Sequence, residues 1–201
     1  MSRRVFDRLT SAGGLVLVVV LVVAGGLLTW GHSFVNSNVH NQLARQQIYF
    51  PSKTAFAHPK AGTEITPTMI PSVSQFAGQQ LLTGAQAEVY ADDFIAKHLY
   101  EMPDHGVYAK ISAAALAAKP GSAAATKLSG LEQTSFQGTT LRGLLLEAYA
   151  FSKIGQVMLW GAIASFIMAA LMALLVSLGI WHAARTPEEV RLGASSPATA
   201  A

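Results

Sequence analysis

Residues 157–181 read VMLWGAIASFIMAALMALLVSLGIW, a run without any ionisable side chain. Residues 9–31 read LTSAGGLVLVVVLVVAGGLLTWG, and only Thr10, Ser11 and Thr29 are polar in that run. An uncharged apolar stretch of about 18 or more residues is long enough as a helix to cross roughly 30 Å of hydrocarbon. The two runs therefore predict two transmembrane helices, residues 9–31 and 157–181, and a chain that crosses the membrane twice.

The first run has an alternative interpretation as a secretory signal peptide. Arg3, Arg4 and Arg8 precede it, and Ala24 ends a small-residue cleavage motif. The apolar core of a signal peptide is about 7–15 residues long, whereas this run continues past Ala24 to Trp30. We therefore expect an uncleaved membrane anchor.

Basic residues beside the two runs indicate the orientation, because positive charge near a span favours the cytoplasmic side. Five arginines flank the outer ends of the runs: Arg3, Arg4, Arg8, Arg185 and Arg191. Three basic residues flank the inner ends: Arg45, Arg142 and Lys153. This modest bias predicts a plasma-membrane protein with cytoplasmic tails at residues 1–8 and 182–201, the second of them disordered, and an extracytoplasmic domain at residues 32–156.

The composition of residues 32–156 excludes several functions. The segment holds nine Lys/Arg and eight Asp/Glu, so it is nearly neutral. The sequence pI of about 9.3 comes largely from the tails and indicates no nucleic-acid partner. Because the chain has no cysteine, disulfides, thiol catalysis and thiolate metal sites are excluded.

Helical patterns continue from both runs into the middle domain. Val35, Val39 and Leu43 recur every four residues, which predicts one apolar helix face. Residues 141–154 (LRGLLLEAYAFSKI) are apolar almost all round, which is too apolar for a solvated helix. We expect the two faces to pack, so that both membrane helices extend into an antiparallel hairpin.

The remainder of the domain predicts a small helical insert. Prolines at positions 51, 59, 67 and 71 predict an irregular connection. Further helices are expected at Ser74–Leu82, Ala85–Met102, Val107–Ala118 and Ser122–Gln133, with another helix starting at Thr139 or Thr140. The predicted fold is therefore an all-α membrane protein: two transmembrane helices, an extracytoplasmic antiparallel helical hairpin and a small helical insert.

Two apolar faces are candidate contact surfaces. Small residues follow four-residue spacing along the second span, and such faces let helices approach closely in lipid: Gly161, Ser165, Ala169, Ala173 and Ser177. They pack either against the first span or against another molecule. The second face lies in the apolar stretch beyond the membrane: Leu144, Leu145, Ala148 and Phe151. It forms either core within one chain or a surface for another copy or another protein.

One cluster combines carboxylates with imidazoles: Asp92, Asp93, His98, Asp104 and His105. The five-residue offset between Asp93 and His98 is poor for chelation on a helix, so solvated acids and a turn are the simpler interpretation. The alternative is a metal or acid–base site formed by Asp93, His98 and His105. No phosphate loop or nucleophile motif occurs, and the uncharged spans argue against an ion path. We therefore predict a non-enzyme without cofactor or metal.

Several blocks of the sequence carry a family resemblance: LTSAGGLVLVVVLVVAGGLLTWG, QQIYFP, FAGQQLLTGAQAEVYADDFIAKHL, VYAKISAAALA and TLRGLLLEAYAFSKIGQ. Together they resemble a family of uncharacterised two-pass actinobacterial membrane proteins, over nearly the whole chain apart from its C-terminal tail. Some members carry an automated label of aromatic ring-opening dioxygenase. Non-haem iron chemistry of that kind needs two histidines and a carboxylate at an open site. The resemblance implies an actinobacterial plasma membrane with both termini inside, and it supplies no catalytic residues.

The leading functional hypothesis is a non-enzymatic envelope scaffold or accessory subunit. Its partners would be the lipid bilayer and either further copies of the chain, forming a homo-oligomer, or other membrane proteins. The alternative is an extracytoplasmic ligand-binding or sensor module anchored by two helices. A concave apolar pocket under the Pro51–Pro71 segment would favour that alternative.

Overall fold

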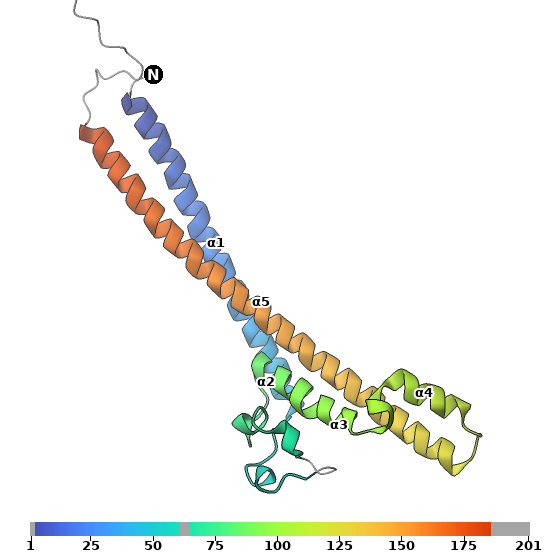
Figure 1. The fold of residues 1–201 in the computed structure, drawn as a ribbon. Coiled ribbons are helices and arrows are strands. Elements are labelled where there is room, and N and C mark those ends of the chain that lie inside the picture. Colours follow the sequence, from blue (N-terminus) through green and yellow to red (C-terminus); the bar gives the residue numbers. More distant parts are fainter. Residues whose placement is uncertain (1–2, 61–64, 186–201) are drawn as a thin grey trace, which may run out of the picture. The chain divides into compact units, whose positions relative to one another are not determined.

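The computed structural model describes residues 3–60 and 65–185, and this part of the chain is almost entirely helical (Figure 1). Tyr49 and Gln80 form one isolated antiparallel bridge, and no named strand occurs among the described residues. The elements in order are α1 (Arg3–Gln46), η1 (Ala55–Ala57), η2 (Pro67–Met69), η3 (Ser74–Phe76), α2 (Gly84–Val89), the π-helix η4 (Tyr90–Ile95), α3 (Ala96–Tyr100), η5 (Pro103–Gly106), α4 (Tyr108–Ala117) and α5 (Ala123–Arg185). The prediction of an all-α chain with two long apolar helices is confirmed.

The described residues divide into two units. The first, here called the apolar unit, contains α1 up to His32 and α5 from Gln156. The second, here called the insert unit, contains the described residues between Ser33 and Gly155. The division falls close to the residues at which the two apolar runs end in the sequence.

In the apolar unit the two helices run antiparallel. Gly14 of α1 lies beside Val176 of α5, and Gly31 lies beside Met158, so the numbering rises along one helix as it falls along the other. Neither helix contains proline. Polar side chains return their hydrogen bonds to their own helix, as Thr29 Oγ1 donates to the Gly25 carbonyl at 2.8 Å. Such internal satisfaction suits a helix in an apolar solvent.

The insert unit is built around one hydrophobic core. Val39 and Leu43 of α1 and Leu145 of α5 are buried together with residues of the connecting segment. The largest fully buried side chains of that segment are Ile65, Met69, Val73 and Leu81. The core therefore joins the irregular connection to the two long helices.

Aromatic rings extend this core along the short helices. Phe50 packs against Phe76 at 5.2 Å between ring centroids and against Tyr90 at 5.3 Å. Tyr90 continues to Phe94 at 4.7 Å, and Phe94 continues to His98 at 4.6 Å. Offset and edge-to-face pairs of this kind add to the stability gained from burial, so they tie η3, η4 and α3 into one layer.

The N-terminus of α2 has a local sequence cause that the periodicity analysis did not identify. Thr83 Oγ1 accepts a hydrogen bond from the Gln86 backbone at 3.2 Å, and Gln86 Oε1 accepts one from the Thr83 backbone at 3.1 Å. This reciprocal capping box satisfies backbone donors that the first helical turn leaves free. Between Ser74 and Leu82, where we expected a helix, the structure forms only the short turn η3.

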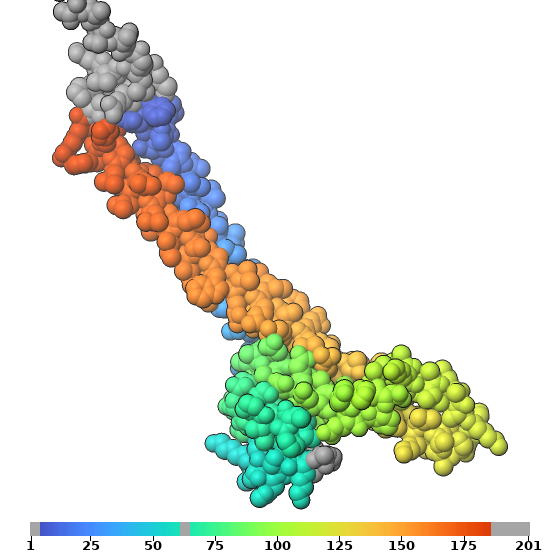
Figure 2. All heavy atoms as spheres, in the orientation of Figure 1, coloured from blue at the N-terminus to red at the C-terminus, as the bar shows by residue number. Residues whose placement is uncertain are grey.

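The expected helix start at Thr139 or Thr140 is wrong, because α5 runs without interruption from Ala123. Two contacts with η5 and α3 hold this part of α5 in place. Ser135 is buried and donates from Oγ to the Gly106 carbonyl at 2.6 Å, and Gly138 makes room for the side chain of Leu99. Figure 2 shows α4 lying along the first turns of α5 without a gap, with Tyr108 against Phe136 at 5.7 Å between ring centroids.

A glycine substitution tests how tightly the insert docks on α5. A Cβ added to Gly84 would overlap the Cβ of Ser152, with the Ala148 carbonyl also close at 3.3 Å. We expect Gly84→Ala to lower the free energy of unfolding by about 1–3 kcal/mol, as overpacking of a tight site does. Gly130→Ala is the matched control, because a Cβ there meets nothing within 4 Å and alanine favours the helix. The measurement is thermal unfolding in mild detergent. Equal melting temperatures for the two variants would contradict close packing of Gly84 against α5.

Candidate functional site

The contact between α1 and α5 in the apolar unit follows spacings that alternate between three and four residues. The less exposed positions of α1 include Ser11, Gly14, Val18, Leu21, Gly25 and Leu28. Those of α5 include Ala162, Ser165, Ala169, Met172, Val176, Gly179 and Ala183. A repeat of 3.5 residues keeps two helices in contact along a left-handed seam. We call these two sets the small-residue seam.

Glycines bring the helices close within the seam. A Cβ on Gly14 would lie 2.5 Å from Val176 Cγ2, and one on Gly25 would lie 2.9 Å from Phe166 Cε1. Only glycine fits at such positions without displacing the facing side chain. At Gly14 and Gly25 the absence of a side chain therefore allows close contact between the two helices.

Part of the predicted stripe in the second span lies at the contact with α1, since a Cβ on Gly161 would also lie 3.2 Å from Leu28 Cδ1. Ser165 and Ala169 are buried, Gly161 and Ala173 are half-buried, and Ser177 is exposed. Because the apolar unit has no other described element, α1 is what covers Ser165 and Ala169. The predicted contact with another molecule through this stripe is untested, but its two central residues are already occupied within the chain.

The opposite faces of both helices are apolar and open. Within the most apolar window of each helix, only 6% of the α1 residues and 17% of the α5 residues are buried. The core helix of a water-soluble protein is buried over most of its apolar surface. By length and composition both helices can cross a membrane.

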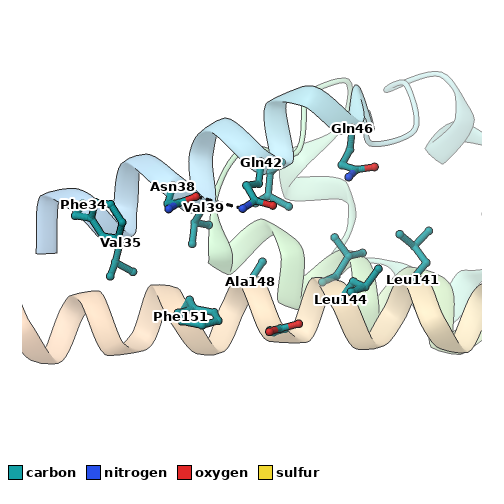
Figure 3. Close-up of a pocket in the computed structure, with 13 residues that line it drawn as sticks. Phe34, Val35, Asn38, Val39, Gln42, Gln46, Leu141, Leu144, Ala148 and Phe151 are labelled. Atoms are coloured by element: carbon teal, nitrogen blue, oxygen red, sulfur yellow. Dashed lines mark hydrogen bonds between the residues drawn. The ribbon is translucent and has the colours of Figure 1, made fainter. Parts of the chain in front are cut away.

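A groove opens between α1 and α5 in the insert unit, and Figure 3 shows the residues that line it. Its volume is about 410 Å³. Val39, Leu43 and Leu145 form its buried floor. The walls are apolar side chains that remain largely exposed: Phe34 (56%), Leu144 (59%) and Phe151 (46%).

Polar groups border the groove without entering its floor. Gln42 Nε2 donates to Asn38 Oδ1 at 3.2 Å, a pair that lies one turn apart along α1 (Figure 3). Gln46 stands farther along the same helix, and Glu147 is the charged side chain that lines the α5 wall. An apolar floor with a polar border is the composition of a protein interface or a ligand site.

The structure gathers all four predicted contact residues of the apolar stretch at this groove. Leu144, Leu145, Ala148 and Phe151 line it, with Leu145 buried and Leu144 the most exposed. The sequence analysis missed Phe34, which faces them from α1. Its position one residue before Val35, at the edge of the predicted apolar face, is the signal that could have identified it.

The cluster of carboxylates and imidazoles is dispersed. Asp92 accepts from Arg142 Nη2 at 2.7 Å, so this acid fastens η4 to α5. His98 Nδ1 lies 2.9 Å from the Phe94 carbonyl, and His105 stacks on Tyr100 at 4.1 Å between centroids. Across residues 3–60 and 65–185 no three histidine or carboxylate side chains converge as a metal site would require.

No protein-family model matches the chain, and comparisons with curated proteins and with solved structures give no match either. The resemblance to actinobacterial two-pass membrane proteins therefore stays a prediction, and the function has to be argued from the groove and the seam.

Adjacent glycines give a matched test of the small-residue seam. Gly25→Val should lower the melting temperature of the detergent-solubilised protein, because the new side chain meets Phe166 and overpacking costs about 1–3 kcal/mol. Gly26→Val adds the same atoms where nothing lies within 4 Å, so it should leave the melting temperature close to that of the wild type. Equal melting temperatures for the two variants would contradict the close contact between α1 and α5 at Gly25.

Proposed function

We propose that the chain is a non-enzymatic membrane scaffold or accessory subunit whose docking surface is the groove of the insert unit. In this proposal α1 and α5 cross the plasma membrane as an antiparallel pair, both termini are cytoplasmic, and the insert unit is extracytoplasmic. The arginines beside the outer ends of the two apolar runs support this orientation.

One observation carries the proposal. The groove exposes large apolar side chains, although the insert unit around it contains many polar and charged residues and is not composed like a membrane span. Leu144 and Phe151 stand beside Glu147 and Lys153, and Phe34 stands near Asn38 and Gln42. A contiguous apolar patch of this kind on a water-exposed surface marks an interaction site. Covering it with a protein partner removes that apolar area from water.

The structure of the apolar unit is consistent with docking through the insert unit. The α1–α5 contact already covers Gly25 of α1 and Ser165 and Ala169 of α5, so these small residues are not available to a further helix. The outward side chains of that unit are mainly Leu, Val, Ile and Phe, which lipid tails solvate as well as a protein does. The specific contacts of the proposed scaffold would therefore form at the groove.

A ligand-binding or sensor module is the second candidate, and the dimensions of the groove favour it. Its volume of about 410 Å³ lies within the range of small-molecule sites, roughly 300–1,000 Å³. The groove is not the pocket under Pro51–Pro71 that would favour a sensor module, because α1 and α5 line it. An apolar molecule that co-purifies with the wild type and is lost from groove variants would favour this candidate over the scaffold.

Leu144→Gln tests the scaffold proposal. Burying a leucine on association contributes about 1.5–3 kcal/mol, so this substitution should dissociate the complex formed in mild detergent without unfolding the chain. Leu116→Gln is the control, because Leu116 is 84% exposed on α4 and does not line the groove. The measurement is the mass of the complex together with the identity of every co-purifying protein. An unchanged complex in both Leu144→Gln and Phe34→Gln would overturn the groove as a docking surface.

A further inference from the structure

Opposite charges stand on the two sides of the groove. Glu147 lines the α5 wall. Arg45 lies seven residues, or about two turns, beyond Asn38, and it therefore projects from the same face of α1 as that groove residue. Both side chains are exposed. Among residues 3–60 and 65–185 the structure gives neither of them a hydrogen-bonding or ionic partner.

The two charges also lie within one helical turn of each other along the groove. Figure 3 shows Gln42 and Gln46 of α1 across from Ala148 and Leu144 of α5. In the sequence Arg45 lies between Gln42 and Gln46, and Glu147 lies between Leu144 and Ala148. Apolar Leu144 and Ala148 lie on the same stretch of the groove, so the arrangement is an apolar centre with one cation on one side and one anion on the other.

We propose that the groove is covered by the groove of a second copy of this chain, related by a two-fold axis parallel to α1 and α5 of the insert unit, so that Arg45 of each copy pairs with Glu147 of the other. This inference rests on the proposed function and names its partner. The result is a four-helix arrangement in which α1 of one copy lies beside α5 of the other.

Charge complementarity is the reason for choosing a second copy as the occupant. A two-fold interface uses the same patch twice, so that patch must carry both members of each ion pair. The groove meets this requirement, because Glu147 lines one side and Arg45 projects from the α1 face on the other side, within one turn along the helices. The axis also preserves the direction of α1 and α5 in the insert unit, because both run parallel to it.

The inference predicts that each charge reversal prevents association on its own. Arg45→Glu places a second carboxylate against Glu147 of the other copy, and Glu147→Arg places two cations together, twice in each dimer. Replacing two attractive pairs by two repulsive ones should raise the dissociation constant of the dimer by roughly tenfold or more. Circular dichroism checks that the variants fold, and Lys127→Glu controls for the change in net charge because Lys127 lies outside the groove.

Mixing the two variants is the decisive experiment. The Arg45→Glu chain and the Glu147→Arg chain, carrying different tags, form attractive pairs only with each other. We expect the mixture to give a heterodimer of twice 21.2 kDa, whereas each variant alone is a monomer and Lys127→Glu dimerises like the wild type. Failure of mixing to restore association would overturn the inference.

If the wild type instead forms a complex with a different protein that Leu144→Gln abolishes, the second copy is excluded and the scaffold stands. If the wild type associates with nothing, both proposals fall.

Discussion

Gly14 and Gly25 have no side chain, and this allows Val176 and Phe166 of α5 to lie against the backbone of α1. In lipid, helices gain no hydrophobic free energy from association, so close van der Waals contact has to hold them together. The small-residue seam provides that contact over the whole apolar unit. The side chains on the outer faces of the two helices are mainly bulky aliphatic ones.

In the proposed topology the insert unit follows different physical rules, because water rather than lipid surrounds it. Its core of Val39, Leu43 and Leu145 joins the long helices to the connecting segment, and the ion pair between Asp92 and Arg142 fastens the π-helix to α5. The same two long helices leave Phe34, Leu144 and Phe151 exposed on the side of the groove. In the proposed function these exposed apolar side chains form the interaction surface, because the insert unit is placed in water.

The sequence was sufficient for features that depend on length and composition and insufficient for those that depend on packing. Two helices long enough to span were evident from their uncharged runs. The four-residue stripe leaves the seam towards Ser177 because each step of four turns by about 40°, so Gly161 and Ser177 differ by roughly 160° around α5. Over the shorter distance from Val35 to Leu43 that drift is small, and Val39 and Leu43 are both buried. The start of α5 was missed because Ser135 and Gly138 are held by Gly106 and Leu99, which are remote in sequence.

The central claim is that this chain acts by associating through its insert unit. The most direct test is the mass of the wild-type complex, measured by native mass spectrometry after release from a membrane-mimetic disc. The account predicts a mass of twice 21.2 kDa, composed of two identical chains. A single chain of 21.2 kDa without any bound protein, at concentrations where membrane complexes persist, would contradict it.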